Sequence, residues 1–251
     1  QHTGDNNVKV DANFFRSTWK NMAFAKQNHS IFLCILGISW FWMVGAVLTS
    51  QFLPLSQIFL KGNSQVSTLL LALFSCGIGL GSLLCNFLVK GEITSKYVPI
   101  SALLMTLFLA DFAWASSGYA ATTELIGWKE FLSTFGGKRL TIDLLGFALC
   151  GGLYVVPLNT MLQHLADEKI RSRVIASNNV ISSLFMVLGS AICSGLLALH
   201  LTIPAVLGIF ALANAVVAIY ICGLLPHHII RMILTRVLNF VYDVKVIGLD
   251  N

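Results

Sequence analysis

The chain has 251 residues, of which 56% are hydrophobic and 11% are charged. Its mean hydropathy is +0.80 and its formal net charge is +5. Soluble domains carry about 25% charged residues, so this composition excludes an ordinary soluble globular protein and indicates a membrane protein. The excess of basic residues does not require a nucleic-acid partner, and none is expected, because basic cytoplasmic loops of membrane proteins attract anionic lipid headgroups.

Six apolar stretches are long enough to cross a bilayer, which takes about 20 mostly apolar residues each. Pro54 and Pro226 are expected to end the first and the last of these spans. The predicted fold is an all-α membrane protein with six transmembrane helices. They cover residues 30–53, 66–89, 97–115, 142–165, 174–199 and 203–225.

The segments outside the spans are polar or amphipathic. Residues 1–29 show no signal peptide and are interpreted as a cytoplasmic linker. The longest connection, 116–141, contains Trp128, Phe131 and Phe135, which predict a short interfacial helix. Residues 226–251 predict an amphipathic helix followed by a strand, "YDVKVIGLDN", that opens a soluble α/β domain. We therefore expect the chain to be part of a longer polypeptide.

Orientation follows from the positions of Lys and Arg, which accumulate in cytoplasmic loops. All but four of the 16 basic residues fall on the side that holds both ends of the chain. Both termini are therefore expected in the cytoplasm. The exceptions are Lys61, Lys129, Lys138 and Arg139.

Small residues and one proline predict how the helices pack. Gly77 and Gly81 lie four residues apart, as do Ala191 and Gly195. This spacing permits close helix contact, either as static packing or as a sliding surface in a protein that rocks between two states. Pro157 follows the Gly151–Gly152 pair and predicts a kink or hinge.

Few polar side chains lie inside the spans, and each needs a partner or water there. Asp111 is the one acidic residue expected well inside a span, as a proton-coupling carboxylate or as a solvated interfacial group. Asn178 and Asn179 are adjacent and therefore about 100° apart around a helix. They are either interhelical hydrogen-bonding groups, with Asn159 or Gln163 as partner, or the lining of a cavity for a headgroup.

Two arginines and six cysteines complete the candidates. Arg171 and Arg173 precede the fifth span and either anchor it at the cytoplasmic surface or contact a headgroup phosphate as a gate. The six cysteines occur singly, without a CxxC pair, so no metal site and no redox cofactor is expected.

Four motifs together resemble the C-terminal half of bacterial lysophospholipid transporters of the major facilitator superfamily. They are "ISWFWMVGAVLTSQFLPL", "GLGSLLCNFLVKGEI", "GGLYVVPLNTMLQH" and "RSRVIASNNVISSLFMVLGSA". The tail resembles the first strand of a fused glycerophospholipid acyltransferase, found in that family with an acyl-carrier-protein ligase. The His-x4-Asp signature of this enzyme is not in the chain, so no catalytic residue is expected here.

The resemblance implies a six-helix half-bundle in a bacterial inner membrane, partnered by an N-terminal transporter half. Its cargo would be a lysophospholipid such as lysophosphatidylethanolamine, moved to the inner leaflet and re-acylated by the fused enzyme. Two alternatives stay open. One is a proton-coupled exporter of drugs or other small molecules, which would depend on Asp111. The other is a membrane anchor for the acyltransferase, which would tolerate leucine at Asn178 and Asn179.

Overall fold

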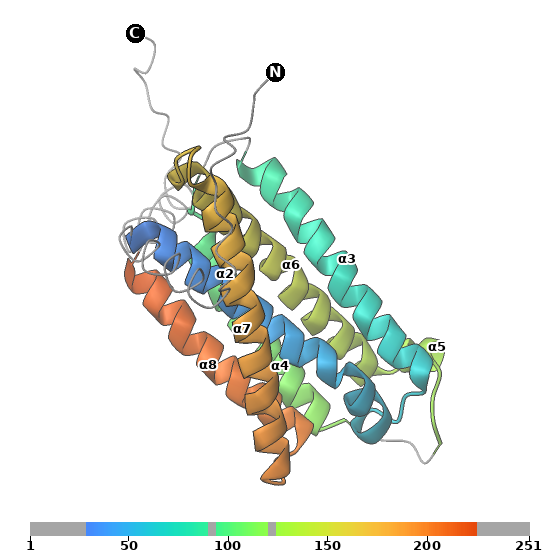
Figure 1. Cartoon of the computed structure of the whole chain (residues 1–251). Helices are drawn as coiled ribbons and strands as arrows, with labels where there is room; N and C mark the ends of the chain where they lie inside the picture. The colour runs from blue at the N-terminus through green and yellow to red at the C-terminus, as the bar shows by residue number, and fades with distance from the viewer. Residues whose placement is uncertain (1–28, 90–93, 120–123, 225–251) are drawn as a thin grey trace, which may run out of the picture.

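A computed structural model describes residues 29–89, 94–119 and 124–224 (Figure 1). The predicted linker, residues 1–29, lies outside these described residues except for His29, and so does the whole of the predicted acyltransferase junction, residues 226–251. The described ranges hold all of the six predicted spans except residue 225, the last of the sixth span.

All six predicted spans are present as helices that are long and apolar enough to cross a membrane. The described part of the chain is therefore a multi-pass helical bundle. The helices are α2 (His29–Pro54, continued by the π-helix η1, Leu55–Phe59), α3 (Ser64–Val89), α4 (Val98–Ser117), α6 (Phe135–Leu165), α7 (Arg171–Ala198) and α8 (Ile203–Leu224). A short helix, α5 (Trp128–Ser133), precedes α6.

The α-helix of the first span ends at Pro54, as predicted, but the span itself continues. The chain continues for one more turn as a π-helix, closed by a 3.1 Å hydrogen bond from the Leu60 N–H to the Leu55 carbonyl. Proline lacks an N–H, and a locally wider turn is one way in which a membrane helix accommodates it. The first helical segment is therefore 31 residues long.

The fourth span also begins earlier than predicted, at Phe135 instead of residue 142. The Thr134 hydroxyl caps this end by accepting a 3.0 Å hydrogen bond from the Gly137 N–H. The seven additional residues move Asp143 from the expected helix end to two turns inside α6. Asp111 is thus not the one acidic residue well inside a span, because Asp143 is a second.

The short helix predicted in the long connection is present as α5. Its Phe131 is fully buried and lies against Tyr119, with ring centroids 6.1 Å apart, whereas Trp128 is 42% exposed. A pair of backbone hydrogen bonds ties Ile126, just before α5, to Lys61 and Asn63. The connection is therefore folded back onto the end of the bundle where α2 ends and α3 begins.

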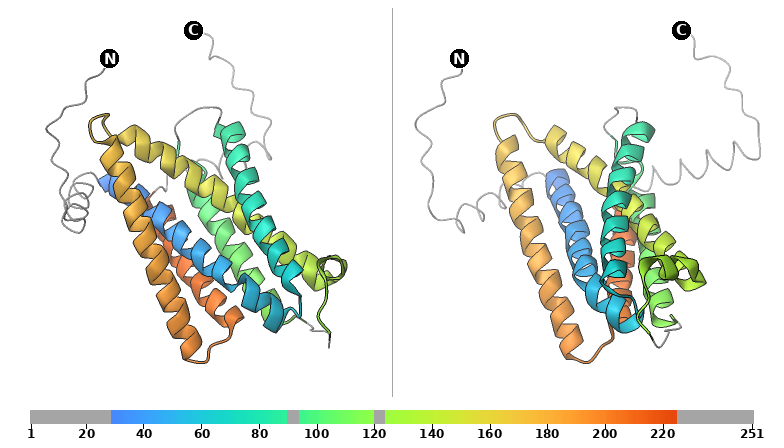
Figure 2. Two further views of the ribbon diagram at one scale, coloured as in Figure 1. Left: turned by 45° about the vertical axis from the view of Figure 1, so that its right-hand side comes forward. Right: turned by 90° about the vertical axis from the view of Figure 1, so that its right-hand side faces the viewer.

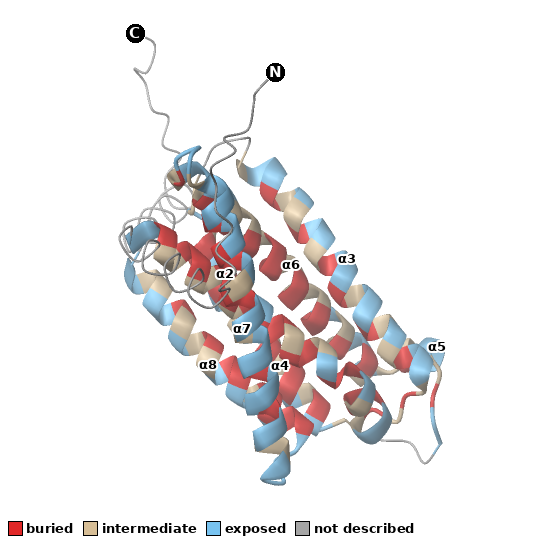
Figure 3. Ribbon diagram, in the orientation of Figure 1, coloured by how far each residue is buried: buried red, intermediate tan, exposed pale blue. Residues whose placement is uncertain are grey.

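Helices α2 and α6 form the centre of the bundle. Helix α6 packs against α2, α3 and α4, while α7 packs mainly on α2 and α8 on α4. Figure 2 shows α7 at one edge of the bundle beside α2. In the apolar segments of α2 and α6, 61% of residues are buried, against 28% in α3 and 22% in α7. The faces of α3 and α7 that this bundle leaves uncovered are drawn as pale blue ribbon in Figure 3.

Helices α3 and α6 meet along a glycine seam, which we define as Gly77, Gly81 and Gly152. A Cβ atom added at Gly81 would overlap the Leu149 carbonyl, and one at Gly152 would lie 2.6 Å from the Ile78 carbonyl. The predicted pair Gly77 and Gly81 is therefore at a close helix contact. The second predicted pair is not, because Ala191 and Gly195 are exposed on α7 and Gly189 packs on α2 instead.

Candidate functional site

A cavity of about 500 Å³ lies at the end of the bundle where α2 begins and α8 ends. Residues from His29 at the start of α2 and from Leu224 at the end of α8 line it together, so both ends of the described bundle lie on the same side. Its volume falls within the range of about 300–1,000 Å³ that is typical of ligand pockets. Its walls are mainly apolar and include Leu33, Leu36, Val98, Leu158, Met161, Phe185, Val217 and Ile221.

A few polar groups border this apolar space. His29 and Ser30, both exposed, and Ser95 lie at the end where α2 and α4 begin. Deeper inside, Tyr154 is buried and its hydroxyl donates a 3.2 Å hydrogen bond to the Gly37 carbonyl, which joins α6 to α2. The cavity therefore combines apolar walls with hydrogen-bonding groups at one end.

A polar network supports one wall of the cavity. The indole N–H of Trp40, which lines the cavity, donates a 2.8 Å hydrogen bond to the side-chain oxygen of Asn214. The Asn214 amide in turn donates to the Thr106 hydroxyl at 2.9 Å and to the Ala102 carbonyl at 3.3 Å. The oxygen and the nitrogen of this buried amide are thus both engaged, and α2, α4 and α8 are linked.

The structure separates the two adjacent asparagines. Asn178 is 6% exposed, and its Oδ1 has no hydrogen-bond partner among the described residues. One turn further along α7, Ser182 bonds Ser39 on α2 at 3.1 Å, so Asn178 faces α2. Asn179 is exposed on the outer face of α7. Neither residue is among those that line the cavity.

Asn159 and Gln163 are not the partners of these asparagines. The Asn159 amide donates a 2.9 Å hydrogen bond to the Val155 carbonyl of its own helix, and Gln163 is exposed. The reason is that α6 and α7, although consecutive in the chain, barely touch, whereas α7 packs along α2. Pro157, two residues before Asn159, is buried within the continuous helix α6.

Arg171 and Arg173 occupy the start of α7, and both are exposed. The Nε of Arg171 donates a 3.1 Å hydrogen bond to the Gln163 carbonyl in the last turn of α6. A cation is favourable there, because the final carbonyls of a helix lack intrahelical donors. This contact gives Arg171 a structural role at the α6–α7 turn. Arg173 lies exposed two residues further along α7.

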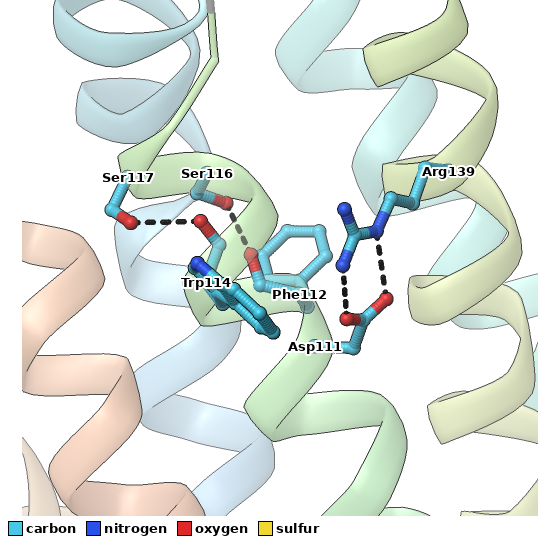
Figure 4. A network of polar contacts seen from close by, with 6 residues as sticks. All are labelled: Asp111, Phe112, Trp114, Ser116, Ser117 and Arg139. Carbon is cyan, nitrogen blue, oxygen red and sulfur yellow. Dashed lines mark hydrogen bonds and ion pairs between the residues drawn. The ribbon is translucent and has the colours of Figure 1, made fainter.

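Asp111 forms an ion pair with Arg139 of α6 (Figure 4). The Arg139 Nε donates a 2.9 Å hydrogen bond to Asp111 Oδ2, and Nη2 donates to Oδ1, so the pair is bidentate. Both side chains are more than a third exposed, and the Arg139 guanidinium lies 5.7 Å from the centre of the Trp114 ring. Asp111 therefore has a charged partner on α6, near the end of the bundle opposite the cavity.

Several residues of these sites were not among the predicted candidates. Trp40 and Tyr154 lie within two of the quoted motifs but were given no role, Asp143 lies in none of them, and Asn214 is a single amide in an apolar helix. The sequence does mark Asn214 as a residue that needs hydrogen-bond partners, because it is an amide inside an apolar span. The partners themselves, Trp40 and Thr106, are 174 and 108 positions away in the chain and cannot be deduced from local spacing.

Comparisons of the chain with protein-family models, with curated proteins and with solved structures found no match. The likeness to lysophospholipid transporters therefore rests on the four sequence motifs. The bundle, its cavity and its polar clusters supply the structural grounds for a function.

Proposed function

We propose that this chain is half of a transporter of single-chain phospholipids, and that its cavity receives the acyl chain. The observation that carries the proposal is the cavity itself, which is apolar along its walls and polar at the end where α2 and α4 begin. A lysophospholipid has the same division into one hydrocarbon chain and one polar head. Major facilitator-like rocking of this half against an N-terminal half would then expose the cavity to each side by turns.

The energetics favour such a cargo. An acyl chain that left hydrocarbon for water would lose about 0.8 kcal/mol per CH₂ group, whereas a chain that enters an apolar cavity keeps most of this stabilisation. The polar head carries the main cost of crossing, because polar groups in hydrocarbon must find partners. The cavity needs only a few such partners, and Ser30, Ser95 and His29 offer hydroxyl and imidazole groups. Lys96, exposed next to Ser95, adds a cation for a phosphate.

The uncovered helix faces support a partner half. The outward face of α7 carries the Asn179 amide among apolar side chains, and this residue is exposed in the half-bundle. Polar groups at this depth require a protein neighbour or a water-filled space, because lipid offers neither. In the proposed transporter this face of α7 lies against the N-terminal half or along the path of the headgroup.

Cavity filling in the full-length polypeptide tests the proposal. The variant Leu158→Trp adds bulk to a residue that lines the cavity, and the matched control Leu212→Trp adds it to a residue 69% exposed on the outer face of α8. Both are reconstituted in liposomes with labelled lysophosphatidylethanolamine. We expect at least a tenfold lower transfer rate for Leu158→Trp, about 1.4 kcal/mol, and an unchanged rate for the control. Equal rates in the two variants would contradict the proposal.

An exporter of apolar drugs is the second candidate, because the same apolar cavity fits its cargo. The two candidates differ in the need for a headgroup. Substitution of Ser30 and Ser95 by alanine removes hydroxyl groups at the cavity and leaves its apolar walls in place. A lysophospholipid transporter should lose transfer, whereas an exporter of apolar drugs should retain efflux.

A further inference from the structure

A second buried acid stands beside the ion pair of Asp111 and Arg139. Asp143 lies one helical turn after Arg139 on α6, so the two side chains share a face of the helix. It is 5% exposed, and its Oδ2 has no hydrogen-bond partner in the described part of the chain. The charged groups that act on it are Asp111 and Arg139, and its carboxyl group is close enough to interact directly with that of Asp111.

The charges of this cluster do not balance when both acids are ionised. Arg139 supplies one positive charge, and its Nε and Nη2 atoms both point to Asp111. Asp143 would then contribute a second, uncompensated negative charge in a buried position. An unpaired buried carboxylate is strongly unfavourable and usually takes up a proton instead. Two close carboxyl groups also resist double ionisation, because their like charges repel each other.

We propose that Asp143 is a proton-binding site, and that its proton is exchanged with water through the neighbouring carboxyl group of Asp111. The bound form is a neutral Asp143 beside the intact Asp111–Arg139 pair. Release transfers one proton to water and leaves two carboxylates that compete for the single guanidinium of Arg139. The route to water is short, because Asp111 lies within the last two turns of α4 and its side chain is 36% exposed. When Asp143 loses its proton, Arg139 can therefore pair either with Asp111 on α4 or with Asp143 on its own helix, α6.

This proton site goes beyond the proposed lipid transport, because it lies toward the opposite end of the bundle and requires no cargo. It also reassigns the acid on which a proton-coupled mechanism would depend. Asp111, the acid expected to serve this purpose, is neutralised by Arg139, whereas Asp143 is deeper and has an oxygen without a partner among the described residues.

Carbodiimide labelling of the full-length protein in native membrane vesicles tests the site, since these reagents modify protonated carboxyl groups in apolar surroundings. Mass spectrometry of the peptide that contains Asp143 locates the adduct. We expect labelling of Asp143 at acidic and neutral pH, and a decrease of about tenfold per pH unit once the proton is released. Because the proposed site binds a proton and not a sodium ion, the addition of sodium ions at constant pH should leave the labelling of Asp143 unchanged.

Two variants separate the acids. Asp143→Asn should lose the adduct at every pH. Asp111→Asn frees Arg139 to pair with Asp143, so it should weaken the labelling of Asp143 at neutral pH and retain it at acidic pH. The absence of an adduct at Asp143 in the wild-type protein at every pH, or protection by sodium at constant pH, would overturn the proposal. The wild-type measurement does not depend on the folding of either variant. The labelling is also measured independently of lysophospholipid transfer. Either proposal, the proton site or the lipid cargo, can therefore be disproved without affecting the other.

Discussion

Trp40 and Asn214, which are 174 positions apart in the chain, are joined by a 2.8 Å hydrogen bond from the indole N–H to the amide oxygen. Because Asn214 also donates to Thr106 and to the Ala102 carbonyl, this one amide connects three helices. Trp40 also lines the cavity, so the network that fastens α8 to α2 and α4 positions part of the cavity wall.

Loss of this amide should weaken the bundle. Asn214→Leu removes three hydrogen bonds and leaves the Trp40 indole N–H without its acceptor. Side-chain hydrogen bonds in membrane proteins contribute about 0.6 kcal/mol each, so we expect a loss of about 1–2 kcal/mol in unfolding free energy. Unfolding in mixed detergent micelles measures it. In a double-mutant cycle, Trp40→Phe should add little to Asn214→Leu, and strictly additive effects would refute the coupling.

The glycine seam predicts a sharp difference between two glycines of α3. Gly81→Ala places a methyl group on the Leu149 carbonyl of α6, so the helices must separate, and overpacking of this kind costs about 1–3 kcal/mol. Gly79→Ala is the matched control, because a Cβ at Gly79 meets nothing within 4 Å. Thermal unfolding of both variants measures the difference. Similar melting temperatures would show that the seam is not a close contact in solution.

The adjacent asparagines should respond differently to leucine. Asn178→Leu removes a buried oxygen that has no partner in the described ranges, so stability should stay the same or rise, because an unsatisfied buried group costs about 1–3 kcal/mol. Asn179→Leu alters an exposed face and should leave the stability of this half unchanged. Lysophospholipid transfer is the second readout. Transport lost in a stable Asn178→Leu protein would show that this amide serves the cargo, whereas transport retained in both variants favours the anchor alternative.

Substitution of the two partners in the Asp111–Arg139 ion pair should affect stability unequally. Arg139→Gln leaves Asp111 and Asp143 facing each other without a cation, whereas Asp111→Asn leaves Arg139 free to pair with Asp143. We therefore expect the arginine variant to melt at a lower temperature than the aspartate variant. The double variant Arg139→Gln/Asp111→Asn should recover part of the loss. An equal loss in both single variants would contradict the role of Asp143.

Much of the fold was predictable, because each span is long and almost free of charge. All six helices lie where hydropathy places them, and α5 contains two of the three aromatic residues that predicted it, Trp128 and Phe131, whereas Phe135 begins α6. The two errors at helix ends have local causes that hydropathy does not register. At Pro54 the helix widens into a π-turn, and at Thr134 a side-chain cap starts α6 within a polar stretch.

The candidate site was harder to predict, because it depends on which helices touch. One alternative for the adjacent asparagines was a hydrogen bond to Asn159 or Gln163 on the preceding helix, but α7 packs on α2. The pair formed by Asp111 and Arg139 likewise joins two residues that belong to different elements. The costly polar groups could be recognised one by one from their places in apolar spans. Their partners depend on the order of the helices around α6, which no local pattern encodes.

The glycine seam fixes the register of α3 against α6. If α3 shifted along its axis by one turn in either direction, Leu73 or Cys85 would move to a place where α6 leaves room for a hydrogen atom alone. Helices α3 and α6 should therefore move together as one rigid unit. A conformational change in this half would therefore involve the helices that pack less closely. Of these, α7 is the best placed to move, because it packs along α2 and makes few other contacts.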